Sequence, residues 1–467
     1  MKQKRKHKDI EEEIEIIDID KEEKEKEKQN IKIKKKVKLK KGLLFQTLFC
    51  LVSIIFILGC CIFYGTRLVK YYKLYNPKDD KGNAVQLLSN KITSTSTFVY
   101  EGEGLYLTGG TYIYKGENVN NYIKYSNLIW RILKINDDKS IDIVLDSSIN
   151  NLKWNSTITD YSKSDVATYL KEEFLPILNE KHLTNTIVCN DKIDDIANIN
   201  CAMPDSSNYV RLLNIDEFLN SKIEDKSYIS NGNNIWLSSR GTKQVWTING
   251  TSLSYADMTN TYNIKPVVTL KNSTPYVSGT GTKKDPYVIE ETKNDIQVGN
   301  RVKLGEDIWT VYSIEDDKLK LSLSTLYKNG TQTYRFDLST NKYDPTKKSS
   351  LAKYLNEAFY NSLSYKDQLL DCTWYIGEYN DSYKDIYSEK VTSKVGLSSV
   401  ADLKLDGEVS NYYLLNGINT NKVYIYSDTL IESKSTLSRA IKPSICIKKA
   451  TIKTGDGTLE KPYTLEG

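Results

Sequence analysis

The sequence predicts an α+β protein in which one apolar, membrane-spanning helix precedes two tandem copies of a domain. An uncharged apolar run lies near the N-terminus, at 43–64. The phrase "GTGTKKDPYVIE" at 279–290 returns as "GDGTLEKPYTLE" at 455–466, with six of twelve residues identical. Each copy contains a hairpin pattern, one helical pattern, an irregular middle and further strand patterns, so both kinds of element are expected.

Composition excludes one class of partner. The chain has 467 residues and is 39% hydrophobic, which is enough for two or three domains with cores of their own. Residues 1–42 hold sixteen basic and eleven acidic residues, whereas the part from Arg67 on holds 49 of each. That long part has no basic field for a phosphate backbone, so we expect no nucleic-acid partner.

The first element is the run "LLFQTLFCLVSIIFILGCCIFY", Leu43 to Tyr64, in which Gln46 is the one strongly polar side chain. As a helix it is about 33 Å long, which matches a hydrocarbon core of roughly 30 Å. A buried core helix would need a polar stripe, and this run is apolar on every face. The sequence therefore predicts a single-pass helix whose partner is the lipid bilayer.

The flanks of this run predict its orientation. Seven lysines lie within 31–41, and the heavier positive flank stays in the cytoplasm. Residues 1–42 are then a charged, partly disordered cytoplasmic tail, 65–99 are a linker, and the rest is extracellular. A cleaved signal peptide and a lipoprotein cleavage before Cys60 are the alternatives. The tail is either solvated or a docking peptide for a cytoplasmic partner.

The next element of each copy is a β-hairpin. "IWRILKINDDKSIDIVL" begins at Ile129 and "IWTVYSIEDDKLKLSLS" begins at Ile308. Apolar residues alternate on both sides of a polar Asp-Asp-Lys turn, which is typical of a hairpin. Trp130 and Trp309 occupy the same position, and we expect both in the core.

A helix follows in each copy. "SDVATYLKEEF" at 164–174 matches "SSLAKYLNEAF" at 349–359, with apolar residues at helical spacing and serine at the position of an N-cap. After an irregular middle, "IKPVVTL" at 264–270 matches "IKPSICI" at 441–447. We expect this strand to form the last hairpin with the Pro-Tyr strand, across a glycine turn. Copy one spans 100–290 and copy two 296–467.

These motifs resemble an uncharacterised family of bacterial surface domains, whose members end in an "IRPVV-L … G-GT-NPY-I" sequence. Copy one is more loosely similar to bacterial C-type-lectin-like modules, through "VRLLNIDEF", "IWLSSRG", "VWTINGTS" and "IKPVV". The residues that carry this similarity are Val210, Arg211, Leu213, Glu217, Trp236, Ser238, Ser239, Trp246, Gly250 and Pro266, with Lys265 in place of the usual arginine. Copy two departs further, since "YYLLN" at 412–416 replaces the Trp-x-Ser-Ser element. The resemblance implies twisted antiparallel sheets and no settled activity.

Catalytic and metal chemistry find little support in the sequence. His182 is the one histidine beyond the apolar run, and we expect it to be a cap or solvated rather than a catalytic base. The carboxylates of "DKIDD" at 191–195 are the densest group in copy one, and a solvated loop competes there with calcium binding. The cysteines lack zinc spacing. We therefore expect no metal, no cofactor and no enzyme activity.

The candidate site residues are aromatic and polar. Two disulfides are expected, Cys189–Cys201 and Cys372–Cys446, with buried thiols as the alternative. Long irregular segments at 190–210 and 225–262 are candidate binding loops. The candidate ligand-binding residues, whose rings suit sugar stacking but also core packing, are Trp154, Trp236, Ser238, Arg240 and Trp246.

The leading functional hypothesis is a membrane-anchored extracellular binding or adhesion protein, non-catalytic, with a protein or a carbohydrate as ligand. A transmembrane sensor that couples external binding to the cytoplasmic tail is the first alternative. The second is an enzyme of the formylglycine-forming type, which shares this fold and requires an external redox or metal-binding cysteine pair.

Overall fold

An apolar helix, Phe45–Val69, is the first long element and carries a mean hydropathy of 2.6 in its most apolar stretch. The computed structural model describes residues 22–30, 45–69, 72, 84–155, 157–189, 191–199, 201–230, 232, 234–289, 295–405 and 409–466. By length and composition the helix is able to cross a membrane, and the crossing itself stays a prediction. Of the predicted tail at 1–42, only 22–30 lie within the described residues, and these are helical.

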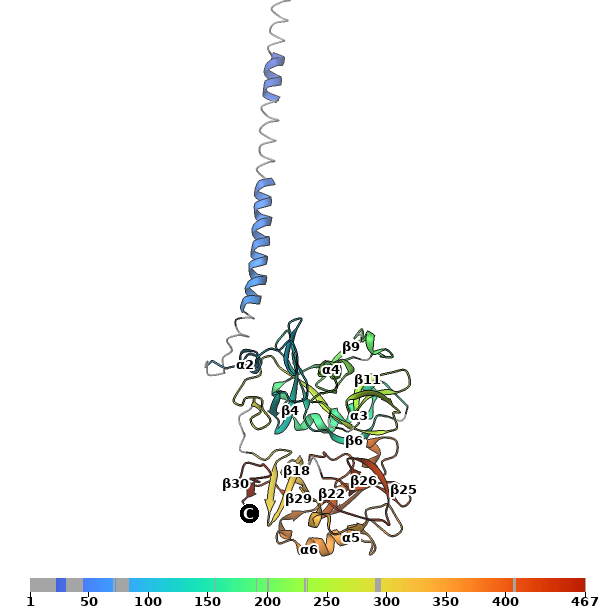
Figure 1. The fold of residues 1–467 in the computed structure, drawn as a ribbon. Helices are drawn as coiled ribbons and strands as arrows, with labels where there is room; N and C mark the ends of the chain where they lie inside the picture. Colours follow the sequence, from blue (N-terminus) through green and yellow to red (C-terminus); the bar gives the residue numbers. More distant parts are fainter. Residues whose placement is uncertain are drawn as a thin grey trace, which may run out of the picture. The chain divides into compact units, whose positions relative to one another are not determined.

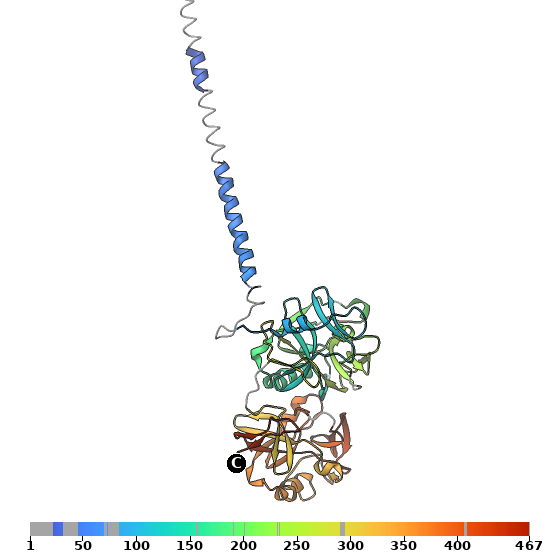
Figure 2. The same ribbon diagram turned by 60° about the vertical axis from the view of Figure 1, so that its left-hand side comes forward.

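The described residues after Asn76 belong to one compact unit. It is of mixed α+β class, mostly sheet with few helices (Figures 1 and 2). We call 84–289 the first half and 295–466 the second half. Part of the predicted linker belongs to this unit, because helix α2 (Leu88–Thr95) buries Leu88 and Ile92.

The first half is built on a nine-stranded sheet and a five-stranded sheet. The nine-stranded sheet has the order β1-β2-β4-β5-β15-β10, with β3 beside β4, β16 beside β3 and β7 beside β15. Its strands are β1 (Gly104–Thr108), β2 (Thr111–Lys115), β3 (Tyr122–Tyr125), β4 (Leu128–Ile135), β5 (Ile141–Leu145), β7 (Leu183–Thr184), β10 (Val210–Leu212), β15 (Pro266–Leu270) and β16 (Tyr287–Val288). The five-stranded sheet comprises β13 (Ser252–Ala256), β12 (Val245–Asn249), β11 (Ile235–Arg240), β14 (Thr261–Ile264) and β6 (Ile149–Lys153), in that order.

The main sheet of the second half has six strands in the order β17-β18-β19-β29-β21, with β24 paired to β29. They are β17 (Arg301–Leu304), β18 (Asp307–Glu315), β19 (Lys318–Leu323), β21 (Leu369–Leu370), β24 (Val395–Leu397) and β29 (Pro443–Lys448). The smaller sheets of the molecule are β8 (Thr186–Cys189) with β9 (Pro204–Asn208), β22 (Cys372–Tyr375) with β23 (Lys390–Ser393), β20 (Tyr334–Arg335) with β28 (Ser438–Arg439), β25 (Tyr412–Asn419) with β26 (Lys422–Ser427) and β27 (Thr429–Lys434), and β30 (Ile452–Thr454) with β31 (Thr464–Leu465).

The central strands of the two main sheets share order and register, with β3-β4-β5-β15 matching β17-β18-β19-β29. Trp130 lies opposite Leu145 in the pair β4–β5, and Trp309 lies opposite Leu323 in the pair β18–β19. Both pairs carry a β-bulge at the same place, two residues further along. Likewise, the pairing of β10 with β15 has the register of β24 with β29. Positions in β3, β4, β5, β7, β10 and β15 therefore have counterparts in β17, β18, β19, β21, β24 and β29, whereas β1 and β2 have none in the six-stranded sheet.

The helices of the compact unit are short, and one helix of the first half corresponds to one of the second half. Ser164 caps α3 (Asp165–Tyr169) and Ser350 caps α5 (Leu351–Tyr354), as the serine positions predict. Each continues into a π-helical turn, η2 (Leu170–Phe174) or η7 (Leu355–Phe359). The others are α4 (Ile215–Asn220), α6 (Tyr360–Ser362) and the 3₁₀ turns η1 (Tyr161–Lys163), η3 (Leu175–Ile177), η4 (Glu180–His182), η5 (Ile196–Asn198), η6 (Tyr327–Gly330), η8 (Lys366–Gln368) and η9 (Tyr383–Ser388).

The closing motif is explained by close packing. Gly279 has φ +93°, and a Cβ there would lie 2.0 Å from the carbonyl oxygen of Pro286. The Pro-Tyr strand does not pair with the Ile-Lys-Pro strand, which corrects the expected last hairpin. Instead Tyr287 pairs in parallel with Ile123 of β3. Tyr463 pairs with Val302 in the same way. A local turn also brings Val288 back to pair with Ser278.

The two halves pack against one another within the compact unit. The side-chain amide of Asn150 donates to the carbonyls of Val400 and Asp402, at 2.8 and 3.0 Å. Tyr169 donates its hydroxyl to the carbonyl of Ala401 at 2.9 Å. One hydrophobic core joins the first half to residues of the second half such as Tyr383, and another core lies within the second half alone.

Candidate functional site

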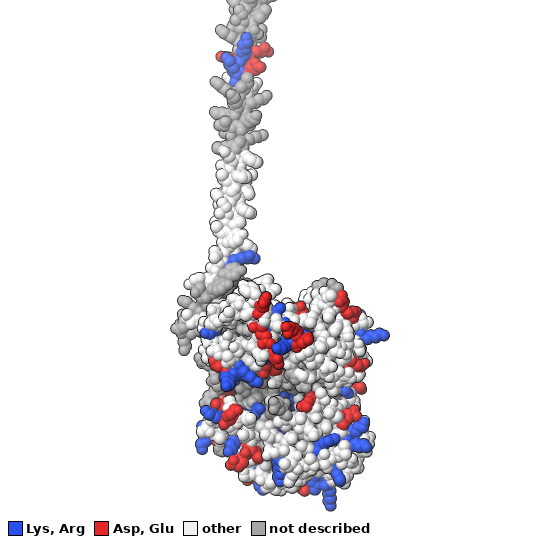
Figure 3. All heavy atoms as spheres, viewed as in Figure 1, with Lys and Arg blue, Asp and Glu red and all other residues white. Residues whose placement is uncertain are grey.

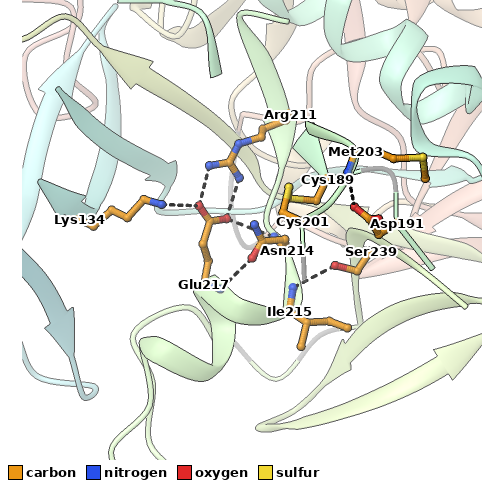
Figure 4. Close-up of a disulfide and its surroundings, with 10 residues drawn as sticks. All are labelled: Lys134, Cys189, Asp191, Cys201, Met203, Arg211, Asn214, Ile215, Glu217 and Ser239. Atoms are coloured by element: carbon orange, nitrogen blue, oxygen red, sulfur yellow. Dashed lines mark hydrogen bonds and ion pairs between the residues drawn. A yellow bond between two sulfur atoms is a disulfide. The ribbon is translucent and has the colours of Figure 1, made fainter. Parts of the chain in front are cut away.

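A pocket of about 820 Å³ lies in the first half, where β4, β5, β10 and β15 meet α4 and the loop at 189–204. Its floor carries four charged side chains, Lys134, Asp142, Arg211 and Glu217. β4 and β5 supply the first two, β10 supplies Arg211, and the first turn of α4 supplies Glu217. Four charges from four elements are thereby brought to one place (Figure 4 shows three of them).

Arg211 is the centre of this floor and is 2% exposed. Its terminal nitrogens Nη1 and Nη2 donate to the two carboxylate oxygens of Glu217, each at 2.6 Å, in a bidentate pair. Its Nε donates to the hydroxyl of Thr186 at 2.6 Å, and Nη1 also donates to the carbonyl of Leu212. Nη2 reaches Asp142 at 3.4 Å. All five N–H groups of the guanidinium thus have partners within the protein.

Asp142 and Glu217 are equally well paired. Asp142 accepts from the hydroxyl of Thr269 at 2.7 Å and lies 3.3 Å from Nζ of Lys134. Glu217 caps its own helix, since Asn214 donates its backbone N–H to the carboxylate and accepts from the N–H of Glu217. The floor therefore balances two positive charges against two negative ones.

The electrostatics of the floor keep Glu217 ionised. Burial raises the pKa of Glu217, but the charge and hydrogen bonds of Arg211 outweigh burial and hold that pKa below its ordinary value. Burial likewise lowers the pKa of Lys134, but the carboxylates of Glu217 and Asp142 raise it above its ordinary value. Both shifts favour the charged forms, so the ion pairs persist at neutral pH.

The rim of the pocket is acidic. Asp137 and Asp138, from the turn after β4, and Asp216, in the first turn of α4, line it and are exposed. Figure 3 shows acidic side chains gathered next to α4 on this face of the first half. Asp138 accepts from the backbone N–H and the hydroxyl of Ser140 through a single oxygen, Oδ1. No basic side chain beyond Lys134 and Arg211 lines the pocket among the described residues.

One wall is apolar and is held by a disulfide. Cys189 and Cys201 are bonded, with their Cα atoms 5.3 Å apart, and both line the pocket with Ile193 and Ile199. Trp246 donates its indole N–H to the carbonyl of Ile193 at 2.7 Å. The N–H of Ile193 in turn donates to the carbonyl of Arg240 at 2.9 Å. Trp246 and Arg240, both predicted to bind ligand, thus hold this wall in place without lining the pocket.

The counterpart of this pocket in the second half is closed. By register, Gly396 takes the place of Arg211, and a Cβ on Gly396 would lie 2.4 Å from the ring of Trp374. Cys372 and Cys446 occupy the positions of Thr186 and Thr269 and are joined by a disulfide. Trp374 is 2% exposed and both cysteines are 0% exposed. An indole and a disulfide fill the space that hydrogen-bonded charges occupy in the first half.

The other predicted ligand-binding residues lie in the core. Trp154 and Trp236 are 0% exposed, with ring centroids 5.6 Å apart. Ser238 is buried and donates to the carbonyl of Leu213 at 3.1 Å. None of the three presents a face to a ligand in this conformation, which moves the candidate site from these rings to the charged pocket.

The candidates for catalysis and metal binding are placed apart from the pocket floor. His182 is buried, with its ring edge-on to Tyr125. In "DKIDD", Asp194 accepts from the N–H and hydroxyl of Thr242 and Asp191 accepts from the N–H of Met203. Among the described residues no group of three His, Cys, Asp or Glu is arranged to hold a metal ion. The four cysteines beyond the apolar helix are all in disulfides.

Sequence reasoning named Arg211 and Glu217 only as carriers of a resemblance and missed Asp142 and Lys134. One signal was available. Asp142 stands in the apolar strand "IDIVL", where a carboxylate is expected only with a buried partner. No family model, no curated protein and no solved structure matches this chain.

Proposed function

We propose that this chain is a single-pass membrane protein, with its N-terminus in the cytoplasm, that presents a non-catalytic ligand-binding module outside the cell. The binding site is the charged pocket of the first half. The proposal also takes the two halves to be tandem copies of one C-type-lectin-like domain, of which the second has lost the pocket. The expected ligand is a protein segment or a glycan.

One observation carries the assignment of the pocket. At matched positions of the two sheets, the first half has an open, charged pocket and the second half has Trp374 and a buried disulfide. A closed core is the simpler way to stabilise this place, because buried ion pairs contribute little to stability compared with apolar packing. Charged side chains around an open pocket are therefore expected where the pocket binds a ligand.

The tandem arrangement is supported by the common register of the sheets, the capped helices and the closing motif. The membrane anchor is supported by the apolar helix Phe45–Val69 and by the lysines that precede it. Protease added to intact cells should remove the part beyond the helix. If that part is shaved only after the cells are lysed, the orientation is wrong.

A pocket-filling variant tests the binding site. Asn185 is exposed at the pocket mouth, and its counterpart Asp371 is exposed in the second half, where Trp374 and the Cys372–Cys446 disulfide fill the corresponding place. Full-length wild type, Asn185→Trp and Asp371→Trp, each in lipid nanodiscs, are screened on glycan and peptide arrays. We expect the signals of wild type to vanish with Asn185→Trp and to persist with Asp371→Trp. Signals that survive in Asn185→Trp would place binding elsewhere.

A further inference from the structure

Resting on the proposed function, we infer that the pocket takes a cationic ligand, namely a primary amine or guanidinium group carried on an apolar segment. The inference joins three properties of the pocket: a floor whose charges are already paired, a rim of carboxylates that have no ion pair among the described residues, and an apolar wall.

The floor has no free cation to offer an anion. All five N–H groups of Arg211 are engaged, and Lys134 lies 3.3 Å from Asp142 and 3.9 Å from Glu217. An anionic ligand would have to break these largely buried pairs, which leaves a carboxylate without its partner and is strongly unfavourable. The floor is therefore a rigid surface of the pocket with no net charge.

The rim supplies the attraction. The charged residues that line the pocket are Lys134, Arg211, Asp137, Asp138, Asp142, Asp216 and Glu217, so two positive charges face five negative ones. After the floor pairs are set aside, three carboxylates remain, from Asp137, Asp138 and Asp216. A concave site lined by one sign of charge concentrates ligands of the opposite sign.

The wall suits an aliphatic chain. Ile193 and Ile199 line the pocket beside the Cys189–Cys201 disulfide, opposite the charged strands. A ligand with a cationic head and an apolar body satisfies the rim and the wall together. Lysine and arginine side chains in a peptide have this form, as does a free diamine, and their shared chemistry is what the pocket recognises.

The test compares three probes of one length and opposite head groups. 1,6-Diaminohexane, 1,6-hexanediol and hexanedioate are titrated by calorimetry into full-length protein in phosphatidylcholine nanodiscs. An acetylated Leu-Lys-Leu amide forms a fourth arm and distinguishes a peptide from a free diamine. We expect the two amine probes to bind at least tenfold more tightly than the diol and the dianion, and more weakly as salt rises.

Matched variants locate the effect. Asp137→Asn/Asp138→Asn/Asp216→Asn should weaken diaminohexane at least tenfold, with the thermal unfolding midpoint measured to show that the fold is kept. Asp316→Asn/Asp317→Asn, in the corresponding turn of the second half, should leave binding unchanged. Equal binding to the triple variant, or no binding of either amine, overturns the inference.

One result separates the two proposals. If the diol or the dianion binds more tightly than the amine and Asn185→Trp abolishes that binding, the ligand class is wrong and the pocket still functions. If amine binding is insensitive to Asn185→Trp, the pocket is not the site and both proposals fall.

Discussion

Arg211 shows how a single buried side chain organises the first half. Its guanidinium ties β10 to α4 through Glu217 and to β8 through Thr186, so three elements depend on one residue. Such a network is costly to desolvate, yet it is strongly destabilising to break from one side.

Replacement of Arg211 should therefore be severe. Arg211→Leu leaves Glu217 and Asp142 buried with one shared cation, and we expect the free energy of unfolding to fall by about 3–5 kcal/mol. Urea titration followed by circular dichroism measures the change. Arg335→Leu, an exposed site on β20, is the control and should change stability little. A loss below about 1 kcal/mol would show that the network is not buried as described.

Lys265 is a second buried cation, and it titrates. Burial lowers the pKa of Lys265 to about 8, against an opposing effect of Asp146 and with a further lowering by Arg131. Its Nζ donates to the carbonyl of Ile229 at 3.1 Å. Because the ordinary pKa of lysine is about 10.4, the unfolded chain binds the proton more tightly than the folded one between these values.

The contribution of Lys265 to stability should therefore rise with pH above 8. Over pH 8 to 9.5 the unfolded state holds at Lys265 a proton that the folded state has released, so the contribution of Lys265 to the free energy of unfolding increases by about 1–2 kcal/mol. Lys265→Met should flatten this rise, whereas Lys283→Met, at an exposed position of the closing turn, should retain it. Urea titrations at a series of pH values make the comparison. Burial raises the pKa of tyrosines such as Tyr161 and Tyr228, which lowers stability as pH approaches 10, so the assignment rests on the difference between wild type and Lys265→Met. A difference that stays constant from pH 8 to 9.5 contradicts it.

For single residues, the sequence indicated which side chains matter better than it indicated what each of them does. Trp130 and Trp309 are buried as expected from their place in an alternating strand. In the sequence, Trp154 and Trp236 are equally compatible with stacking on a sugar and with packing in the core. Only the tertiary structure shows that they pack in the core. Asp142 and Arg211 lie far apart in the chain, and no local pattern indicates that they meet.

At the scale of elements, the two disulfides differ in what they connect. Cys189–Cys201 closes a local loop with a sequence separation of 12, whereas Cys372–Cys446 joins β22 to β29 across a separation of 74. A cross-link that closes a longer loop restricts the unfolded chain more, to which loop-closure entropy assigns about 4–5 kcal/mol for the long loop and about 3 kcal/mol for the short one.

Removal of the pairs should reflect this difference. Cys372→Ala/Cys446→Ala should lower the free energy of unfolding more than Cys189→Ala/Cys201→Ala, by roughly 1–2 kcal/mol from the loop term and more from the lost packing of the buried pair. Urea titration without reductant measures both. The short-loop variant should also lose the binding at the pocket, because its wall is released. Equal losses of stability would contradict the loop argument.

Elements with a strong local pattern were predictable. The Asp-Asp-Lys hairpins and the serine-capped helices rest on alternation, helical spacing and a capping side chain, all of which act within a few residues. The closing strand is the exception. Its glycines and its Pro-Tyr pair indicate a turn and an edge strand, but its partner is β3, more than 150 residues earlier, and such pairing leaves no trace in local sequence.

At the scale of the whole molecule, the halves depend on one another. Asn150 adopts φ +32° and donates to two carbonyls of the second half while it is 1% exposed. Loss of a buried hydrogen-bond partner costs about 1–3 kcal/mol for each group left unsatisfied. The shared core adds apolar contact to these bonds.

We expect the unit to unfold as one. Scanning calorimetry of the full chain should show a single transition, and Asn150→Ala/Tyr169→Phe should shift the whole transition down by several degrees. Asn118→Ala, at an exposed position of the first half, serves as the control. Two transitions in wild type, of which the double variant moves only one, would show that the halves fold independently.

The fold class of the molecule could be predicted from the sequence, but the contact between its two halves could not. A repeat, an apolar run and two kinds of periodicity are enough to predict a mixed α+β chain with an apolar helix at the front. Contact between the halves depends on single side chains such as Asn150 and Tyr169, whose sequence neighbourhoods are those of ordinary strand and helix residues.

The closing segment of each half folds back beside an earlier strand of the same half, β3 or β17, and this has a consequence for evolution and for engineering. In the first half the N–H of Tyr276 donates to the carbonyl of Gln86 and the N–H of Val277 donates to the carbonyl of Val288, and in the second half Tyr463 lies beside Val302, so the entry and exit of each half are neighbours in space. Segments with adjacent ends tolerate circular permutation and insertion into other chains. Such a segment is also readily duplicated in series, because a second copy starts where the first one stops and no strand has to be threaded.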